Sequence, residues 1–389
     1  MTSEARTSPA VRMLFRAALP LAVLLAGCQQ PALSQRSPQT VDPSSVAGDI
    51  TSSRRTAITT AVETVAPAVV SVNVLEVRQV RVRDPWAGDP FFEQFFGRRP
   101  DRVMQQQVQG AGSGFVVSPD GYIVTNDHVA ANAARITVAF PDGSQLDARL
   151  VGTDPETDVA LLKVTPESDL PYLAFEEEED AIVGEWAVAL GNPFGLFMAA
   201  EPSVTVGVVS AVGRDFPLQE GRVFRDMIQT DAAINSGNSG GPLVNASGRV
   251  IGMNTFIFSN TGSTVGLGFA VPGWRVARVV EELRERGAVD RSFYTGLNVR
   301  PLNERVARAL GRPDARGLVV ASVDPGSPAE AAGLAPYDIV VAIDGEAVET
   351  TADVRSRLLD ARPGDTIQLA VVREGRTITL PLRLQRATG

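Results

Sequence analysis

Between residues 112 and 271 the sequence is a succession of short apolar segments, and this pattern most constrains the fold. Turn clusters such as Pro119-Asp120-Gly121 and Pro141-Asp142-Gly143 separate segments that have the length and composition of β-strands. Short strands at this spacing are typical of an all-β barrel or sandwich. The region is long enough for two barrels with a cleft between them. The expected strands are 114–117, 122–124, 135–140, 159–164, 185–190, 204–210, 227–230, 242–244, 250–253 and 266–271.

Further elements divide the rest of the chain. Residues 58–69 are expected to open with a short helix, and residues 70–82 alternate enough to form a strand. Apolar residues at helical spacing predict a helix between Pro272 and Gly287, which closes the β domain. We therefore expect a mainly β domain over residues 56–288 and a small α+β domain over residues 292–386. The latter has expected strands at 317–323, 338–343, 366–372 and 377–384 and expected helices at 328–332 and 351–361.

The N-terminus has the pattern of an export signal. Three arginines precede an apolar segment, residues 17–27, that is shorter than the roughly 20 residues a membrane-spanning helix needs. The segment ends in Leu25-Ala26-Gly27-Cys28, which resembles the lipobox of bacterial lipoproteins. That resemblance implies cleavage after residue 27 and a lipid on Cys28. Residues 28–55 are rich in Ser, Pro, Gln and Thr with almost no periodic apolar pattern, so we expect a flexible tether there. The alternative is an ordinary secretory signal with an incidental thiol. Cys28 is the sole cysteine, which excludes an intrachain disulfide.

Two further segments lack a regular pattern. Residues 84–109 are expected to form a long loop that carries Phe91, Phe92, Phe95 and Phe96, either as a functional loop or as a patch on the core. The acidic run at residues 176–180 is typical of a solvated loop rather than a metal site. The net charge of −9 argues against nucleic-acid binding. We expect neither a cofactor nor a metal.

Three motifs carry residue types that together suit nucleophilic catalysis. Ser239 lies among glycines, so its hydroxyl is exposed and nearby N–H groups can bind an oxyanion. His128 is the only histidine and has the right intrinsic pKa for a general base. Asp158 precedes the apolar segment 159–164, which would fix it against the core as the orienting carboxylate. Asp127 and Asp154 are rival carboxylates: the former is adjacent to His128 and points elsewhere, and the latter lies four residues before Asp158.

Taken together, these motifs resemble those of the trypsin-like serine proteases of the HtrA/Deg family, across most of residues 61–384. The resemblance implies that Ser239 attacks a peptide carbonyl, that His128 is its base and that Asp158 orients His128. It implies that the N–H groups of Gly237 and Ser239, with Asn238 as a further candidate, bind the oxyanion. Ser236 departs from the family pattern, where many members carry proline.

The same resemblance implies regulatory segments. Residues 191–196 resemble the activation region beside the active site, residues 215–225 the sensor loop, and the four phenylalanines the aromatic loop that reaches a neighbouring subunit. The C-terminal domain resembles a single PDZ domain, in which Tyr294, Thr295, Gly296 and Leu297 form the loop that binds a peptide's C-terminal carboxylate. A homotrimer is also implied.

The leading hypothesis is an envelope serine endopeptidase, anchored on the periplasmic side, that degrades misfolded or exposed polypeptides and is regulated by C-terminal peptides at the PDZ domain. A second hypothesis is a chaperone or C-terminus-sensing protein that uses the protease fold as a scaffold. An esterase for small acyl substrates is a third, less favoured interpretation. The cleavage preference and the physiological substrate are not predicted.

Overall fold

The computed structural model describes residues 54–82, 102–176, 181–193, 201–219, 222–235, 237–257, 267–312 and 314–387. The predicted signal segment, Cys28, the four phenylalanines and Ser236 lie outside the described residues, as does most of the predicted tether. Along the described part of the chain, no helix is long and apolar enough to cross a bilayer.

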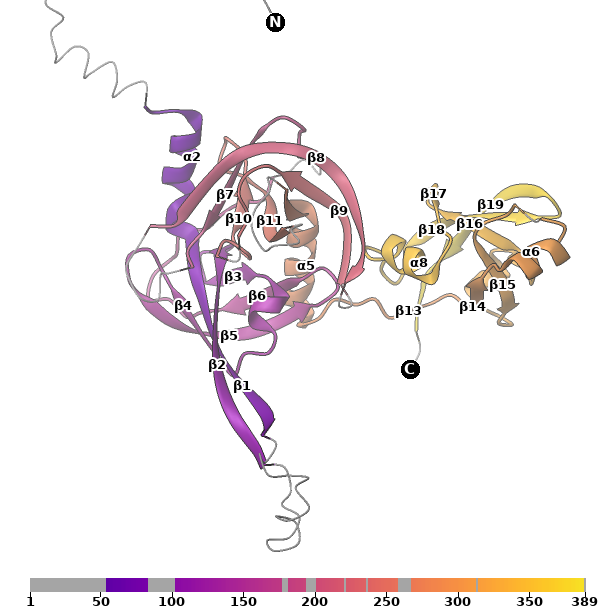
Figure 1. The fold of residues 1–389 in the computed structure, drawn as a ribbon, viewed down its shortest axis with the longest axis horizontal. Helices are drawn as coiled ribbons and strands as arrows, with labels where there is room; N and C mark the ends of the chain where they lie inside the picture. The colour runs from indigo at the N-terminus through magenta and orange to yellow at the C-terminus, as the bar shows by residue number, and fades with distance from the viewer. Residues whose placement is uncertain are drawn as a thin grey trace, which may run out of the picture. The chain divides into compact units, whose positions relative to one another are not determined.

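Six strands close the first barrel, in the order β1-β2-β3-β6-β5-β4 (Figure 1). A capped helix, α2 (Ala57–Val65), and a 3-10 turn, η1 (Ala66–Ala68), lead into it, and a single helical turn, α4 (Asp127–Ala130), follows β3. Valine, isoleucine and leucine occupy most of the buried positions of these strands, which suits a pleated, buried surface. The strands are β1 (Val69–Val82), β2 (Arg102–Val116), β3 (Tyr122–Thr125), β4 (Arg135–Ala139), β5 (Gln145–Asp154) and β6 (Val159–Lys163).

A second barrel of six strands follows, in the order β10-β11-β12-β9-β8-β7. Helix α5 (Gly273–Arg286) then packs against both barrels through Val276, Val279 and Leu283, which are buried. It begins after Pro272 and ends at Gly287 in the left-handed conformation, as the sequence predicted. The strands are β7 (Trp186–Gly191), β8 (Ser203–Gln219), β9 (Arg222–Thr230), β10 (Pro242–Val244), β11 (Val250–Ile257) and β12 (Gly268–Pro272).

The C-terminal domain is a sheet in the order β14-β15-β16-β18-β19 with helices packed on it, so β14 is an edge strand. The predicted mainly β fold with a small α+β domain is confirmed. Its elements are β13 (Phe293–Tyr294), β14 (Leu297–Pro301), α6 (Glu304–Ala309), β15 (Leu318–Val323), α7 (Pro328–Ala331), β16 (Ile339–Ile343), β17 (Glu346–Ala347), α8 (Thr351–Arg357), β18 (Thr366–Arg373), β19 (Arg376–Arg383) and β20 (Gln385–Arg386).

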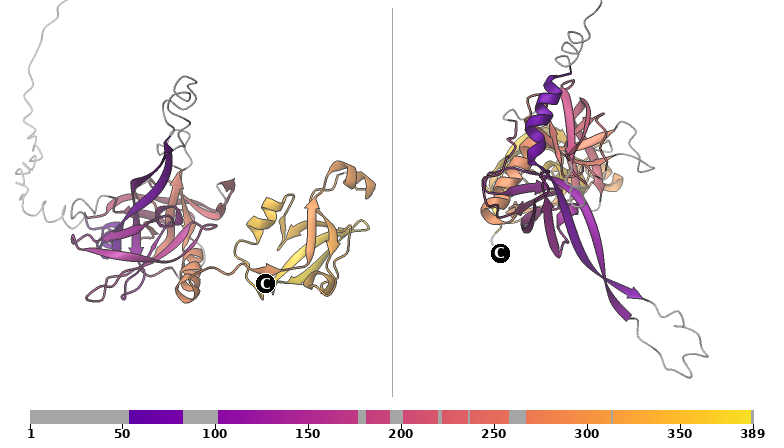
Figure 2. Two further views of the ribbon diagram at one scale, coloured as in Figure 1. Left: turned by 90° about the horizontal axis from the view of Figure 1, so that it is seen from below. Right: turned by 90° about the vertical axis from the view of Figure 1, so that its left-hand side faces the viewer.

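The prediction of a loop over residues 84–109 was wrong at its C-terminal end. Residues 102–109 belong to β2 and pair in register with the outer half of β1, from Leu75↔Gln109 to Val82↔Arg102. The glutamines of this stretch carry no alternating apolar pattern, because the two strands form a hairpin that projects beyond the barrel (Figure 2). Strand pairing rather than core burial holds them extended. The sequence analysis also overlooked β5, whose side chains are mostly exposed or half-buried.

The predicted sensor loop, residues 215–225, is a hairpin rather than a loop in the part that the structure describes. Its residues extend β8 and open β9, and the two strands pair with several irregularities from Val209↔Thr230 to Gln219↔Arg222. Such irregularities re-aim side chains along a strand. The hairpin therefore brings charged side chains to two different neighbours, the first barrel and the C-terminal domain.

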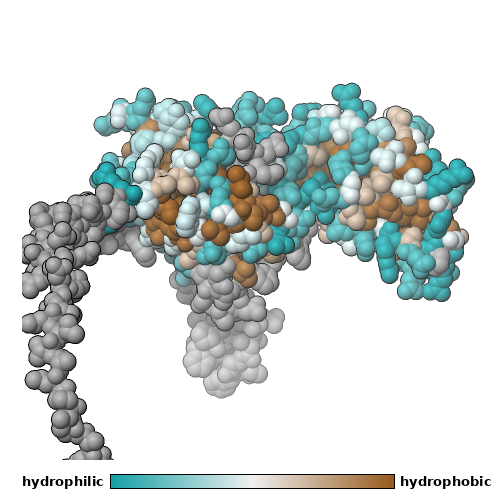
Figure 3. Space-filling model, turned by 90° about the horizontal axis from the view of Figure 1, so that it is seen from above, coloured by the Kyte–Doolittle hydropathy of each residue, from teal (hydrophilic) through white to brown (hydrophobic). Residues whose placement is uncertain are grey.

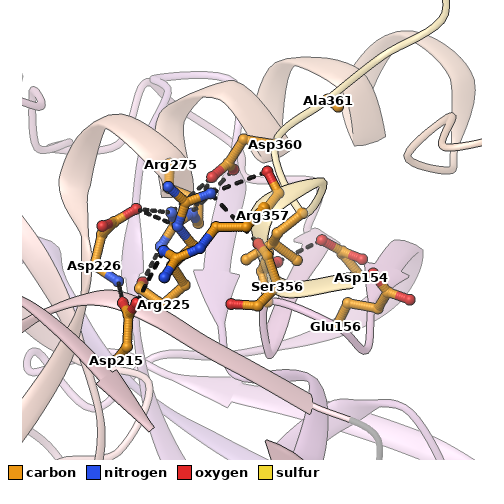
Figure 4. Close-up of polar contacts among 12 residues, drawn as sticks. Asp154, Glu156, Asp215, Arg225, Asp226, Arg275, Ser356, Arg357, Asp360 and Ala361 are labelled. Carbon is orange, nitrogen blue, oxygen red and sulfur yellow. Dashed lines mark hydrogen bonds and ion pairs between the residues drawn. The ribbon is translucent and has the colours of Figure 1, made fainter. Parts of the chain in front are cut away.

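Contacts between the barrels and the C-terminal domain are ionic. Residues Ser53–Gly389 form one unit, and Arg275 of α5 lies at the centre of the contact with only 1% of its surface exposed. Its guanidinium binds Asp360 through Nε at 3.0 Å and Nη2 at 2.7 Å, and Asp226 through Nη2 at 3.1 Å (Figure 4). Arg225 of β9 donates to the carbonyl of Arg357, the last residue of α8, at 3.0 Å. On the face that Figure 3 draws, apolar patches lie among hydrophilic areas.

Candidate active site

His128 and Asp158 form the centre of the predicted site. The imidazole Nδ1 lies 2.8 Å from Asp158 Oδ2 and 3.0 Å from Oδ1. The backbone N–H of His128 also donates to Oδ1 at 3.0 Å. When Nδ1–H donates a hydrogen bond to the carboxylate, Nε2 carries no proton and is the acceptor that a general base requires. The side chain of Asp158 is 2% exposed, whereas that of His128 is 39% exposed, so the ring is open to a substrate.

The backbone around Asp158 is tightly constrained. Asp158 has φ of +60°, a left-handed conformation that costs energy in a residue other than glycine. Its carbonyl accepts hydrogen bonds from the Asn126 side chain at 3.0 Å and from the Asp127 N–H at 3.1 Å. The turn that carries the carboxylate is thereby tied to the start of α4, which carries the imidazole. Strained backbone held by several such bonds is common at functional sites.

Thr255 of β11 joins this pair to Ser239. Its hydroxyl donates to Asp158 Oδ2 at 2.8 Å, and its carbonyl accepts from the Ser239 hydroxyl at 3.2 Å. The Ser239 hydroxyl also lies 3.3 Å from the carbonyl of Asn235. Thr255 therefore contacts both Asp158 and Ser239, and the serine hydroxyl is directed at carbonyl oxygens rather than at the imidazole.

The loop before Ser239 is built by side-chain hydrogen bonds. Asn238 holds it through Nδ2 to the carbonyl of Ala233 and Oδ1 to the N–H of Asn235. The N–H of Asn238 donates to the carbonyl of Asn235 at 3.0 Å, so it is engaged within the loop. Among the described residues, the N–H groups of Gly237 and Ser239 donate to no carbonyl. In this arrangement the N–H groups of Gly237 and Ser239 remain open to a ligand, whereas that of Asn238 is bonded within the loop.

Ser113 fixes this loop to the first barrel. Its hydroxyl donates to the carbonyl of Gly237 at 2.7 Å and accepts from the N–H of Asn192 at 2.8 Å. Its N–H donates to the carbonyl of Ser239 at 3.0 Å. Gly240 lies against the same strand with φ of +84°, and a Cβ there would meet the Ser113 carbonyl at 2.3 Å. Only glycine fits this position.

The electrostatics of the site differ between its two buried aspartates. Burial raises the pKa of Asp158. The hydrogen bonds and charge of His128, together with the Thr255 hydroxyl, lower it by more than burial raises it, so the net pKa is below the ordinary value. Burial, and then the charge of Asp158, raise the pKa of Asp127 above its ordinary value. Asp158 is consequently ionised at neutral pH, as an orienting carboxylate must be.

The two rival carboxylates contact arginines. Asp154 accepts a bidentate pair of hydrogen bonds from Arg291 at 2.6 and 2.7 Å and a third from Thr157. Asp127 faces Arg222, whose Nη2 lies 3.5 Å from Oδ2. Of the described carboxylates, Asp158 is the one bonded to the His128 ring, which agrees with the choice made from the sequence.

The predicted peptide-binding loop of the C-terminal domain lies between β13 and the edge strand β14. The carbonyls of Thr295 and Gly296 accept hydrogen bonds from Ala329 and Asp324, and the Leu297 N–H donates to the Thr295 hydroxyl at 3.2 Å. Tyr294 donates its phenol proton to Asp324 at 2.7 Å. Gly296 has φ of +68°, and a Cβ there would lie 2.1 Å from that of Ser327. The loop backbone is thus held by its carbonyl side.

Comparison with known proteins identifies both domains. Residues 112–253 match the model of the trypsin-like peptidase domain, and residues 294–384 match that of the PDZ domain. The solved structure of the HtrA-type protease AlgW with a decapeptide superposes with a TM-score of 0.61, at 36% identity, covering 85% of this chain and 98% of that one. The chain belongs to the HtrA/Deg family.

Curated relatives agree with this assignment. The HtrA/Deg chain is 44% identical over 298 residues to a probable periplasmic serine endoprotease, DegP-like, of Chlamydia trachomatis, covering 76% of this chain and 58% of that protein. It is 39% identical over 345 residues to the DegP-like protein of Brucella suis, covering 81% and 66%. The chain thus spans about three fifths of the length of the first of these relatives. The serine endoprotease from Yersinia pestis superposes with a TM-score of 0.54 at 31% identity.

The sequence analysis missed three residues of the site. Thr255 is a small polar residue in a mostly apolar strand, and Ser113 stands between two glycines of β2. Their burial, at 4% and 0% exposure, is the signal that marks them once the strands are placed. Arg222 carried no signal, because its position beside Asp158 depends on the pairing of β8 with β9.

Proposed function

We propose that this chain is a serine endopeptidase of the bacterial cell envelope that cleaves misfolded or exposed polypeptides. The observation that carries the proposal is the connection of His128, Asp158 and Ser239 through Thr255. The names of the periplasmic DegP-like relatives support the compartment and the reaction.

In the proposed mechanism, Ser239 attacks the peptide carbonyl while His128 Nε2 removes its proton and then transfers that proton to the leaving amine. Asp158 holds the ring in the required tautomer and stabilises the imidazolium. The N–H groups of Gly237 and Ser239 bind the oxyanion, and each such donor contributes about 10²–10³-fold to the rate. The Ser239 hydroxyl must first turn from the carbonyls of Asn235 and Thr255 toward the imidazole, which makes the present arrangement a resting one.

The loop sequence Gly237-Asn238-Ser239-Gly240-Gly241 also fits the Gly-x-Ser-x-Gly motif of α/β-hydrolases. In those esterases the serine lies on a turn between a strand and a helix. Here Ser239 lies in a turn that leads into strand β10 of a barrel. This context favours a peptidase over an esterase.

The test is the Ser239→Ala variant, assayed with labelled casein and with a fluorophosphonate probe. We expect a loss of activity of about 10⁶-fold, as when the nucleophile is removed from other triads, and no covalent labelling. The exposed Ser210, replaced by alanine, is the matched control and should behave as wild type. If the wild-type chain binds unfolded protein but neither cleaves it nor reacts with the probe, the non-proteolytic chaperone hypothesis replaces this one.

The PDZ domain is proposed to bind C-terminal peptides and to regulate cleavage. The outer edge of β14 offers backbone groups for an added strand, and the loop of Tyr294, Thr295, Gly296 and Leu297 offers N–H groups for the carboxylate. The AlgW structure with a decapeptide supports peptide binding in this family. A peptide with a free C-terminus should stimulate cleavage, and its C-terminally amidated form should not.

Lipid attachment and trimer formation complete the proposal. We propose that Cys28 carries the lipid and that the protein faces the periplasm, which labelling with a radioactive fatty acid tests, with Cys28→Ser as the control. A homotrimer is supported by the exposed apolar side chains of Trp186, Val204 and Val206 on the second barrel. Light scattering on the chain without residues 1–28 should give three times the monomer mass.

A further inference from the structure

We propose that Arg222 is a positioning residue for the Asp158–His128 pair, brought to it by the β8–β9 hairpin to offset the second buried carboxylate, Asp127. The inference rests on the proposed roles of Asp158 and His128. It assigns to the sensor segment a direct contact with the site.

The geometry places Arg222 between two aspartates. Its Nε lies 3.2 Å from Asp158 Oδ1, and its Nη2 lies 3.5 Å from Asp127 Oδ2. Asp158 Oδ1 is the same atom that accepts the backbone N–H of His128 and contacts the ring Nδ1 at 3.0 Å. The guanidinium and the imidazole therefore share one carboxylate oxygen.

This position is fixed by the backbone. Arg222 is the first residue of β9, and the N–H of the next residue, Val223, donates to the carbonyl of Glu156 at 2.9 Å. Glu156 lies in the turn that carries Asp158, so the start of β9 is tied to that turn. The Arg222 side chain is 20% exposed, which leaves it only partly screened by water.

The charges explain why a cation is required there. Asp127 and Asp158 are 5% and 2% exposed, and His128 carries a charge only when it is protonated. Two like charges buried side by side disfavour ionisation of both. Burial, followed by the charge of Asp158, raises the pKa of Asp127, whereas a hydrogen bond with Thr153 and then Arg222 lower it; the net pKa is above the ordinary value. Arg222 thus lies where its charge offsets part of the charge of the two carboxylates.

The same cation acts on the base. A positive charge on the far side of the shared carboxylate disfavours protonation of His128, whereas the charge of Asp127 favours it. Among the side chains that the structure describes, the other charged groups on the elements that pack against α4 are in ion pairs or exposed, as Arg149 is. These pairs are Asp154–Arg291, Glu156–Arg355, Lys163–Asp120, Arg135–Asp147 and Glu76–Arg78.

The experiment measures kcat/KM for an unfolded substrate across the acid limb of the pH profile in the full chain. Removing the charge with Arg222→Met should raise the midpoint of the acid limb by about 0.5–1 pH unit, because the imidazolium is no longer disfavoured. Arg222→Lys, which keeps the charge, should leave the midpoint at the wild-type value. Asp127→Asn alone should lower the midpoint, and the double variant Arg222→Met with Asp127→Asn should return it toward wild type.

A solely structural role predicts a different pattern. If Arg222→Met lowers activity by the same factor at every pH, or if Arg222→Lys moves the midpoint as far as Arg222→Met does, the inference is wrong. If Arg222→Met does not fold, Asp127→Asn still tests the inference. An unchanged midpoint of the acid limb in Asp127→Asn would overturn the inference. Absence of fluorophosphonate labelling in the wild-type chain would instead refute the proposed function, so the two failures are distinguishable.

Discussion

Replacing Arg275 with leucine should destabilise the molecule far more than replacing a neighbouring arginine on the same helix. The Arg275 side chain is 2% exposed and pairs with Asp360, which is 21% exposed, and with Asp226. Removing one partner of a buried ion pair leaves an unpaired charge and costs about 3–5 kcal/mol. The partial exposure of Asp360 places the expected loss of unfolding free energy near the lower end, at about 3 kcal/mol.

Arg278→Leu is the matched control. Arg278 is on the same helix, but its side chain is 40% exposed, and its Nε lies 3.8 Å from Glu282. Glu282 keeps a second partner, Arg362, at 2.8 Å. An exposed pair of this kind contributes at most about 1 kcal/mol, so we expect a loss within about 0.5 kcal/mol. Urea unfolding followed by circular dichroism and by tryptophan fluorescence measures both variants, and Trp274 lies beside the Arg275 guanidinium.

The dependence on pH gives a second, independent measurement. Burial raises the pKa of Asp360, but the hydrogen bond and charge of Arg275 lower it by more than burial raises it, so the net pKa is below the ordinary value. The stabilisation is therefore present above the unfolded pKa of about 3.9 and is lost as the pH falls through the lower folded value. The difference between wild type and Arg275→Leu should narrow on acidification.

Asp360→Asn in the Arg275→Leu background should recover at least about 1 kcal/mol, because the uncompensated charge is then gone. The reasoning is refuted if Arg275→Leu costs no more than Arg278→Leu, or if the added Asp360→Asn change lowers stability further.

Three other outcomes are expected. Thr255→Val removes the hydroxyl that donates to Asp158 and should reduce kcat/KM together with about 1.5–3 kcal/mol of unfolding free energy; unchanged kinetics would exclude Thr255 from the site. Gly296→Ala should weaken peptide binding at least tenfold in fluorescence anisotropy, because the new Cβ would lie 2.1 Å from that of Ser327. The control Gly326→Ala, with φ of +73° and open space around it, should not weaken binding. Equal effects of the two changes would assign the loss to backbone strain. Ser113→Ala should lower kcat more than KM in steady-state assays, since the loop that carries Gly237 and Ser239 loses an anchor; a change in KM alone would contradict this.

Most strands of both barrels could be predicted from the sequence because they are short, continuous apolar segments. Val159–Lys163 and Trp186–Gly191 are buried along nearly their whole lengths, and both were predicted within a residue or two. Residues 102–109 and β5 were not predicted to be strands, because pairing with a neighbouring strand, rather than an apolar face, determines their conformation. Local pattern carries no information about such long-range partners.

In the candidate site, too, some features could be predicted from local sequence and others depend on strand pairing. His128, Asp158 and Ser239 lie in motifs whose residue types indicate their chemistry, and their catalytic roles stay predictions that the proposed variants test. The orientation of the Ser239 hydroxyl, the inward N–H of Asn238 and the approach of Arg222 depend on backbone geometry that arises only when the strands have paired. The boundaries expected for the signal segment, tether and two domains also stay predictions.

Thr255 has a consequence for when the molecule can act. It belongs to β11, which takes its place only when the second barrel closes between β10 and β12. A nascent chain with only its first barrel complete carries the imidazole and the carboxylate, yet it lacks the threonine contact and the nucleophile. A slip of β11 by one residue turns the threonine hydroxyl to the opposite face. On the proposed catalytic roles, cleavage therefore requires that both barrels are closed.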